Sequence, residues 1–278
     1  MNKELTRKEA IEYLKIPEKH FDNYFRNSAE IQGYKKISRW YFSKSNLDDW
    51  NELRKKRTLS LGLSDYEKCF KFAIKMAYSS TGGHGTGIRG ARSEVQIADD
   101  FIIGILAEHG FKKFLQNRFW TSVKLDMAVH PGQITPQDIV AVKKKRKWKE
   151  PKLCIAVKSS KIKSCFNVID PLEYENPKRK SDVYVFARVD LPSDHLFRIL
   201  REHSFFRKVK DYLDKNKNFR KIDELKKIKV WICGFSWHKE LYKTNEIPGQ
   251  KFEGYRYAKS VKDMHNSDKD WNKLMSKL

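Results

Sequence analysis

The stretch "TPQDIVAVKKKRKWKEPKLCIAVKSS", Thr135–Ser160, holds two apolar segments separated by a basic tip. This pattern predicts two antiparallel strands joined by a longer loop. If the hairpin is symmetric about Trp148, Asp138 lies opposite Lys158. Side chains alternate along a strand, so Asp138, Ala156 and Lys158 share one face. An acid and a base are therefore expected side by side at the open end of the hairpin.

The rest of the C-terminal part predicts alternating helices and strands. Helices are expected at 93–109 and around 194–214, and strands near 119–129, 138–142, 153–158, 182–189 and 229–236. The fold class is therefore α/β, with one central mixed sheet and local hairpins.

Charge is the strongest compositional signal. The chain has 278 residues, with 58 Lys and Arg against 35 Asp and Glu, a formal net charge of +23. Such a field attracts polyanions, so nucleic acid is the expected partner; the alternative is a lysine-rich bias on solvated faces. The four cysteines show no CxxC spacing and suggest core thiols rather than a zinc ribbon or a disulfide framework.

No apolar run is long enough for a membrane span, and the N-terminus lacks the apolar core of a signal peptide. We therefore expect a soluble protein of the prokaryotic cytoplasm with no membrane partner.

Residues 1–57 predict a compact unit of two short helices, a tight turn, a small hairpin and a third helix. The unit resembles the excisionase and MerR-like winged helix-turn-helix domains. The matching residues are Leu5, Thr6, Glu9, Ala10, Leu14, Arg39, Trp40, Phe42, Leu47 and Trp50.

That resemblance implies two sets of DNA contacts. The second helix would enter the major groove with Lys19, His20, Asn23 and Arg26, and the wing would contact phosphates with Lys35, Lys36 and Arg39. Glu18 and Asp22 place acid on the same helix, which leaves open which of its side chains face DNA. A helical cap used only for packing is the alternative.

Residues 58–92 are predicted to connect this unit to the C-terminal domain, residues 93–278, through a helix and a Gly-rich loop. The loop is interpreted either as an arm along DNA, with Arg89 and Arg92 at its end, or as an ordinary linker.

A further acid comes from the helix that starts near residue 93. Glu94 is followed at helical spacing by Ala98, Phe101 and Ile105, which places it at one end of the core-facing stripe. The alternative is an acid that only favours the helix dipole. Two carboxylates and a lysine on a basic protein suggest Mg²⁺-dependent hydrolysis of phosphodiesters.

Residues 93–236 resemble the PD-(D/E)XK nuclease superfamily, and specifically type II restriction endonucleases. "TPQD" corresponds to the first half of the motif and "IAVK" to the second. The resemblance implies catalytic positions Asp138, Glu94, Ala156 and Lys158, and a Mg²⁺ ion held at Asp138, Val157 and Glu94. It also implies cleavage that leaves a 5′-phosphate, and a companion DNA methyltransferase.

The chain departs from the motif at Ala156, where the family has an acid. Three explanations stand: an inactivated variant, which we rank slightly first; an acid supplied from elsewhere by Glu94, Glu173 or Glu175; or a protein that binds DNA without cutting it. Asp126 is a further acid on an earlier strand.

Basic residues near the motif complete the expected DNA surface. Lys161 and Lys163 lie where the backbone would pass, and residues 143–149 are basic enough to grip phosphates. A homodimer acting on a palindromic site is expected. The rival function is a non-catalytic regulator or excision factor that reads DNA through residues 1–57; an RNA-binding module is disfavoured because no RNP-type strand or KH loop is present.

Overall fold

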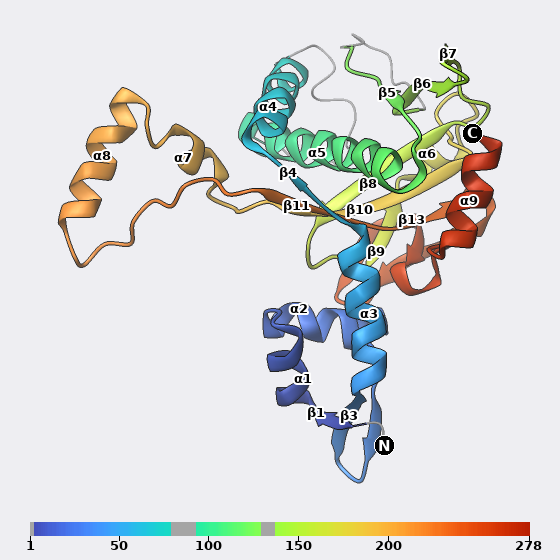
Figure 1. The fold of residues 1–278 in the computed structure, drawn as a ribbon, viewed down its shortest axis with the longest axis horizontal. Helices are drawn as coiled ribbons and strands as arrows, with labels where there is room; N and C mark the ends of the chain where they lie inside the picture. The colour runs from blue at the N-terminus through green and yellow to red at the C-terminus, as the bar shows by residue number, and fades with distance from the viewer. Residues whose placement is uncertain (1–2, 79–92, 129–136) are drawn as a thin grey trace.

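The computed structural model describes residues 3–78, 93–128 and 137–278 and shows a mixed α/β protein with several sheets (Figure 1). The central sheet has the strand order β4-β11-β10-β8. β8 is parallel to β10, whereas the other two pairings are antiparallel, so the sheet is mixed as predicted. Its strands are β4 (Thr58–Leu61), β8 (Ile155–Lys161), β10 (Val183–Asp190) and β11 (Ile228–Trp237).

Two helices cover one face of the central sheet, α4 (Leu63–Ala77) and α5 (Glu94–Phe119). The predicted helix at 93–109 is thus confirmed but extends to Phe119. α5 approaches the sheet closely at Gly110, where an added Cβ would lie 2.5 Å from Val230 Cγ1. A larger side chain at position 110 would push helix and sheet apart.

The N-terminal unit contains the elements that the sequence predicts. Thr6 caps the first helix: its hydroxyl accepts from the N–H of Glu9, and the Glu9 carboxylate accepts from the N–H of Thr6 at 2.7 Å. Lys15, at φ 51°, makes the turn to the second helix. The elements are β1 (Glu4–Thr6), α1 (Arg7–Leu14), α2 (Glu18–Asp22), the π-helical turn η1 (Asn23–Asn27), β2 (Tyr34–Lys36), β3 (Arg39–Ser43) and α3 (Lys44–Arg57).

The segment predicted to connect the two units is, in its described part, integral to the core. β4 follows α3 directly and pairs with β11 at the edge of the central sheet. The helix expected after it is α4, which packs on α5. The Gly-rich loop with Arg89 and Arg92 lies outside the described residues.

The N-terminal unit packs against the face of the sheet opposite α5 (Figure 1). Tyr24 and Trp50 contact Trp231 of β11 with ring centroids 5.8 and 5.7 Å away. Cys69, Cys165 and Cys233 are buried free thiols, in agreement with the expected core thiols. An arm formed by α7 (His195–Leu200) and α8 (Ser204–Lys215) extends away from the sheet.

The hairpin predicted about Trp148 is built differently, and the predicted pairing of Asp138 with Lys158 across it is wrong. β6 (Ile139–Lys144) turns at Lys145 and Arg146 and pairs with β7 (Lys147–Lys149). Trp148 therefore lies within a strand rather than at the tip, and β8 joins the central sheet. β6 also pairs with β5 (Val123–Leu125), and a third sheet has the order β12-β13-β9, formed by β12 (Tyr242–Ile247), β13 (Gln250–Ser260) and β9 (Phe166–Ile169).

The remaining elements are short. They are α6 (Pro171–Glu175), η2 (His238–Glu240), η3 (Val261–Asp263) and α9 (Asp268–Lys277).

Candidate active site

Asp138 lies against the edge of β8, although not through the predicted hairpin. Its N–H donates to the carbonyl of Ile155 at 3.0 Å, and its carboxylate accepts from the N–H of Val157 at 2.6 Å. β8 is the last strand of the central sheet and presents unpaired backbone groups, which Asp138 satisfies. The acid is thereby fixed beside the segment that carries Lys158.

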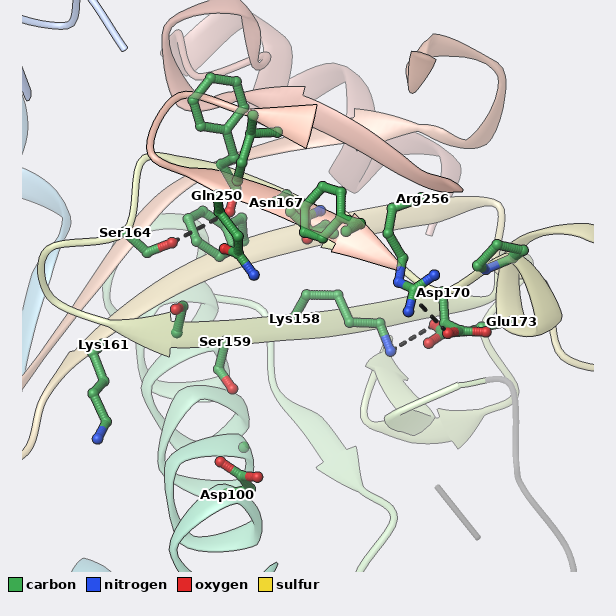
Figure 2. A pocket seen from close by; sticks show the side chains of 18 of the residues that line it. Asp100, Lys158, Ser159, Lys161, Ser164, Asn167, Asp170, Glu173, Gln250 and Arg256 are labelled. Atoms are coloured by element: carbon green, nitrogen blue, oxygen red, sulfur yellow. Dashed lines mark hydrogen bonds and ion pairs between the residues drawn. The ribbon is translucent and has the colours of Figure 1, made fainter. Parts of the chain in front are cut away.

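Lys158 forms an ion pair with Glu173, with 2.6 Å between Nζ and Oε1 (Figure 2). Glu173 lies on α6, which begins after β9. Asp170 starts this helix by accepting from the N–H of Leu172 at 2.9 Å, and Pro171 occupies the first helical position. Of the acids that could replace the one missing at position 156, Glu173 is therefore the one in contact with the lysine.

Electrostatics hold Lys158 in its charged form. Burial acts to lower the pKa of the ammonium, but the carboxylates of Glu173 and Asp138 outweigh burial and the pKa is raised. Conversely, burial raises the pKa of Asp138 to about 6, and Lys158 and the N–H of Val157 only partly offset this rise.

Glu108 on α5 is an acid that sequence analysis missed. It is buried, and its pKa is raised well above the ordinary value, first by burial and then by the nearby carboxylate of Asp138. Glu108 continues the helical stripe that runs from Glu94 through Ile105. The signal was present, but the helix was expected to end at about residue 109, where a core-facing acid attracts little attention.

Glu94 does not reach this cluster. It is exposed in the first turn of α5. At 1.5 Å per residue, it lies roughly 21 Å along the helix from Glu108. Asp126 follows β5 and donates its N–H to the carbonyl of Asp138 at 3.0 Å, so this further acid lies nearby.

Ala156 is buried in a small apolar cluster with Ile169, Tyr184 and Leu241. Its methyl group faces no cation there. A carboxylate at this position would be desolvated among apolar groups, which is costly.

A groove of about 1090 Å³ runs past Lys158. Lys158 and Glu173 lie on one side, Asp100 of α5 lies opposite, and the β12–β13 hairpin forms a further wall (Figure 2). The lining includes the cations Lys158, Lys161, Lys251 and Arg256, and the acids Asp100, Asp170, Glu173 and Glu253.

The donor set suits Mg²⁺ in number and type. Within the described ranges, no three His, Cys, Asp or Glu side chains stand close enough to form a complete metal cage. Mg²⁺ is commonly held by only one or two carboxylates, together with waters and substrate phosphates. Asp138 and Glu173 meet that requirement, and the raised pKa of Asp138 is what a cation would reverse.

The second helix of the N-terminal unit is only partly available for DNA. Glu18 and Asp22 both pair with Arg7 of α1, at 2.7 and 2.6 Å, so these acids are neutralised within the unit. Asn23 donates to the carbonyl of Lys163 at 3.4 Å, so it faces the core rather than solvent alone. Lys19 and Arg26 are exposed, and His20 is half-buried.

The predicted wing and the loop after β8 are accessible. Lys35, Lys36 and Arg39 are exposed, although Lys36 pairs with Glu4 at 2.7 Å. Lys161 and Lys163 are also exposed, and Lys161 lines the groove.

Comparison with protein-family models, with curated proteins and with solved structures finds no match to this chain. None of the helices in the described ranges combines the length and apolar composition needed to cross a membrane.

The pKa of Asp138 predicts a pH dependence of stability. Unfolded, this carboxyl ionises near its ordinary value of 3.8, whereas in the fold it ionises near pH 6. The native state therefore holds a proton that the unfolded state has lost, and stability falls as pH rises between about 4 and 6. The check is thermal unfolding in EDTA, with Asp138→Asn as reference. The melting temperature of the unaltered chain should fall relative to the variant across this window; a constant difference would contradict the assignment.

Proposed function

We propose that this chain is a Mg²⁺-dependent endonuclease that hydrolyses double-stranded DNA at a specific sequence, in the manner of type II restriction enzymes. The observation that carries the proposal is the placement of Lys158 against Glu173 and beside Asp138 on the wall of a groove. A charged lysine between two carboxylates, on a chain of net charge +23, suits an anionic phosphodiester substrate.

Each residue has a distinct role in this proposal. Asp138 and Glu173 would hold the metal, with the main-chain carbonyl of Val157 as a further oxygen. When bound, Mg²⁺ would polarise the phosphate and lower the pKa of a bound water. Lys158 stabilises negative charge on the attacked phosphate or on the attacking hydroxide.

The reaction is a hydrolysis. The water oxygen bonds to phosphorus, the bond to the 3′ oxygen breaks, and the proton released from water ends on that leaving oxygen. The products are a 5′-phosphate and a 3′-hydroxyl. Glu108, buried behind Asp138, would keep the local carboxylates at high pKa until a cation arrives.

The proposal includes the finer fold assignments. The sheet around β8 with α5 would be a PD-(D/E)XK core whose second acid has moved from position 156 to Glu173. Residues 1–57 would be a winged helix-turn-helix domain contacting DNA through Lys19, Arg26, Lys35 and Arg39. A homodimer would match a palindromic site, and a companion methyltransferase would protect the host DNA.

A second candidate is a DNA-binding regulator without catalytic activity. Ala156, in place of the family's acid, favours it. It would share the DNA-binding surfaces but perform no chemistry.

Cleavage of long unmethylated genomic DNA separates the two candidates. With Mg²⁺, the purified chain is expected to yield discrete fragments, and EDTA should abolish them. Binding without any cleavage, both by this chain and by Ala156→Glu, would favour the regulator. Absence of both binding and cleavage would contradict either function.

A further inference from the structure

The hairpin of β6 and β7 carries a concentrated positive charge at its tip. Every residue from Lys143 to Lys149 except Trp148 is Lys or Arg. Most of this stretch is exposed, including the whole of β7. Within the described part of the chain, none of these cations forms an ion pair with an acid. A cluster of like charges without partners is costly unless a counter-charge binds it.

The turn at this tip has an unfavourable sequence for its geometry. Lys144 pairs with Lys147, so the loop is the two residues Lys145 and Arg146, at φ 46° and 67°. Two consecutive residues with positive φ make a type I′ turn, which strongly favours Asn-Gly. Long side chains with a Cβ are strained in this conformation. The strain is retained although a cheaper turn would fit the same loop.

The hairpin is firmly attached at its base. Ile139 and Val142 of β6 are buried in the main core. Trp148 of β7 lies under Lys124 of β5, with Nζ 4.7 Å from the ring centroid. The tip therefore has a defined position relative to the candidate active site.

Its distance from Asp138 suits a DNA duplex. At about 3.4 Å per residue, the extended chain from Asp138 to Lys145 spans roughly 24 Å. Along a duplex, which rises about 3.4 Å per base pair, this corresponds to about seven base pairs. The tip can thus contact phosphates well outside the reaction centre.

We propose that Lys145 and Arg146 bind DNA phosphates away from the scissile bond, and that their charge is kept at the expense of turn stability. The inference rests on the proposed DNA substrate and adds a contact surface to it. Because phosphates carry no sequence information, the hairpin contributes affinity and orientation rather than base recognition.

Two variants of the full chain separate charge from strain. Lys145→Asn with Arg146→Gly removes both charges and supplies the preferred turn. Lys145→Gln with Arg146→Gln removes the charges and keeps the strain. The matched control, Lys68→Gln with Lys112→Gln, removes two exposed charges from the outer helices α4 and α5.

Binding to a duplex of about 40 base pairs is measured in EDTA as a function of salt, so that cleavage does not intervene. Both hairpin variants are expected to bind on the order of 10-fold more weakly, with a salt slope smaller by about 2, whereas the control matches the unaltered chain. Only the Asn-Gly variant should melt higher, by roughly 2–5 °C.

The failures are distinguishable. If the unaltered chain binds and cuts DNA but both hairpin variants bind with its affinity and salt slope, the hairpin inference is overturned alone. If the control weakens binding equally, only net charge matters and the inference again fails. If the unaltered chain does not bind duplex DNA, the proposed function falls and the inference with it. An Asn-Gly variant that melts no higher would refute the trade-off.

Discussion

Glu173→Gln is expected to lower the rate of DNA cleavage about 10³-fold while leaving the fold intact. The amide keeps the shape of the side chain but removes the charge that faces Lys158 at 2.6 Å and that would hold Mg²⁺. Asp138→Asn should have a similar effect. Single-turnover cleavage under saturating enzyme isolates the chemical step from binding.

The matched control is Glu175→Gln on the same helix. Glu175 is exposed and accepts from the hydroxyls of Tyr255 and Tyr257 rather than contacting Lys158. It should cut at the rate of the unaltered chain. Equal losses at positions 173 and 175 would indicate that α6 matters only as a structural element.

Ala156→Glu distinguishes a relocated acid from an inactivated variant. Because Ala156 packs against Ile169, Tyr184 and Leu241, we expect the added carboxylate to destabilise the fold without raising activity. A large gain of cleavage by this variant, with an inert unaltered chain, would instead show that an acid belongs at position 156.

The helix acids give a second matched pair. Glu108→Gln should reduce cleavage, because Glu108 lies buried beside Asp138, whereas Glu94→Gln should not, because Glu94 is exposed at the far end of the helix. If only Glu94→Gln reduced cleavage, the sequence prediction would hold against the structural placement.

The sequence predicted the proximity of Asp138 and Lys158, but not the route to it. Period-two alternation identified both strands, since alternation depends on local residues. The pairing failed because Lys145 and Arg146 carry no turn signal, so the hairpin centre was placed at Trp148 instead. Asp138 then meets β8 through hydrogen bonds at a sheet edge, which no local pattern encodes.

The acids illustrate the same limit. Glu173 was one of three candidates, and its choice depends on where α6 docks, a tertiary fact. Glu108 could have been found by following the helical stripe one step beyond Ile105. In the N-terminal unit, local capping and turn signals predicted every element, yet the contact of Asn23 with the loop after β8 depends on packing between distant segments.

Arg188→Met is expected to destabilise the protein by about 3–5 kcal/mol, because it leaves a buried carboxylate without its partner. Arg188 of β10 is fully buried, and its guanidinium donates to both carboxylate oxygens of Glu30 at 2.9 and 2.6 Å. It also donates to the carbonyl of Ser164 and stacks between Tyr24 and Trp231, with Cζ 4.6 and 4.4 Å from their ring centroids.

A double-mutant cycle tests whether this pair joins the N-terminal unit to the sheet. Glu30→Met alone should also be strongly destabilising, since it strands the buried Arg188. The double variant with Met at both positions should recover much of the loss, because no unpaired buried charge remains. Arg188→Lys should remain destabilising, since an ammonium cannot bind both oxygens in a planar fork or stack as broadly. Urea unfolding measures each variant; strictly additive losses would contradict a coupled pair.

The same variants test what the pair does for DNA binding. Glu30 belongs to the N-terminal unit and Arg188 to the sheet that carries Lys158, so the pair fixes the angle between the proposed DNA-reading surface and the groove. If that angle matters, the double variant should bind duplex DNA but select its site less sharply, even where its stability is restored. Proteolysis should then release residues 1–57 sooner than from the unaltered chain. A double variant with unchanged site selection would mean that Tyr24, Trp50 and Trp231 hold the unit in place by apolar packing alone.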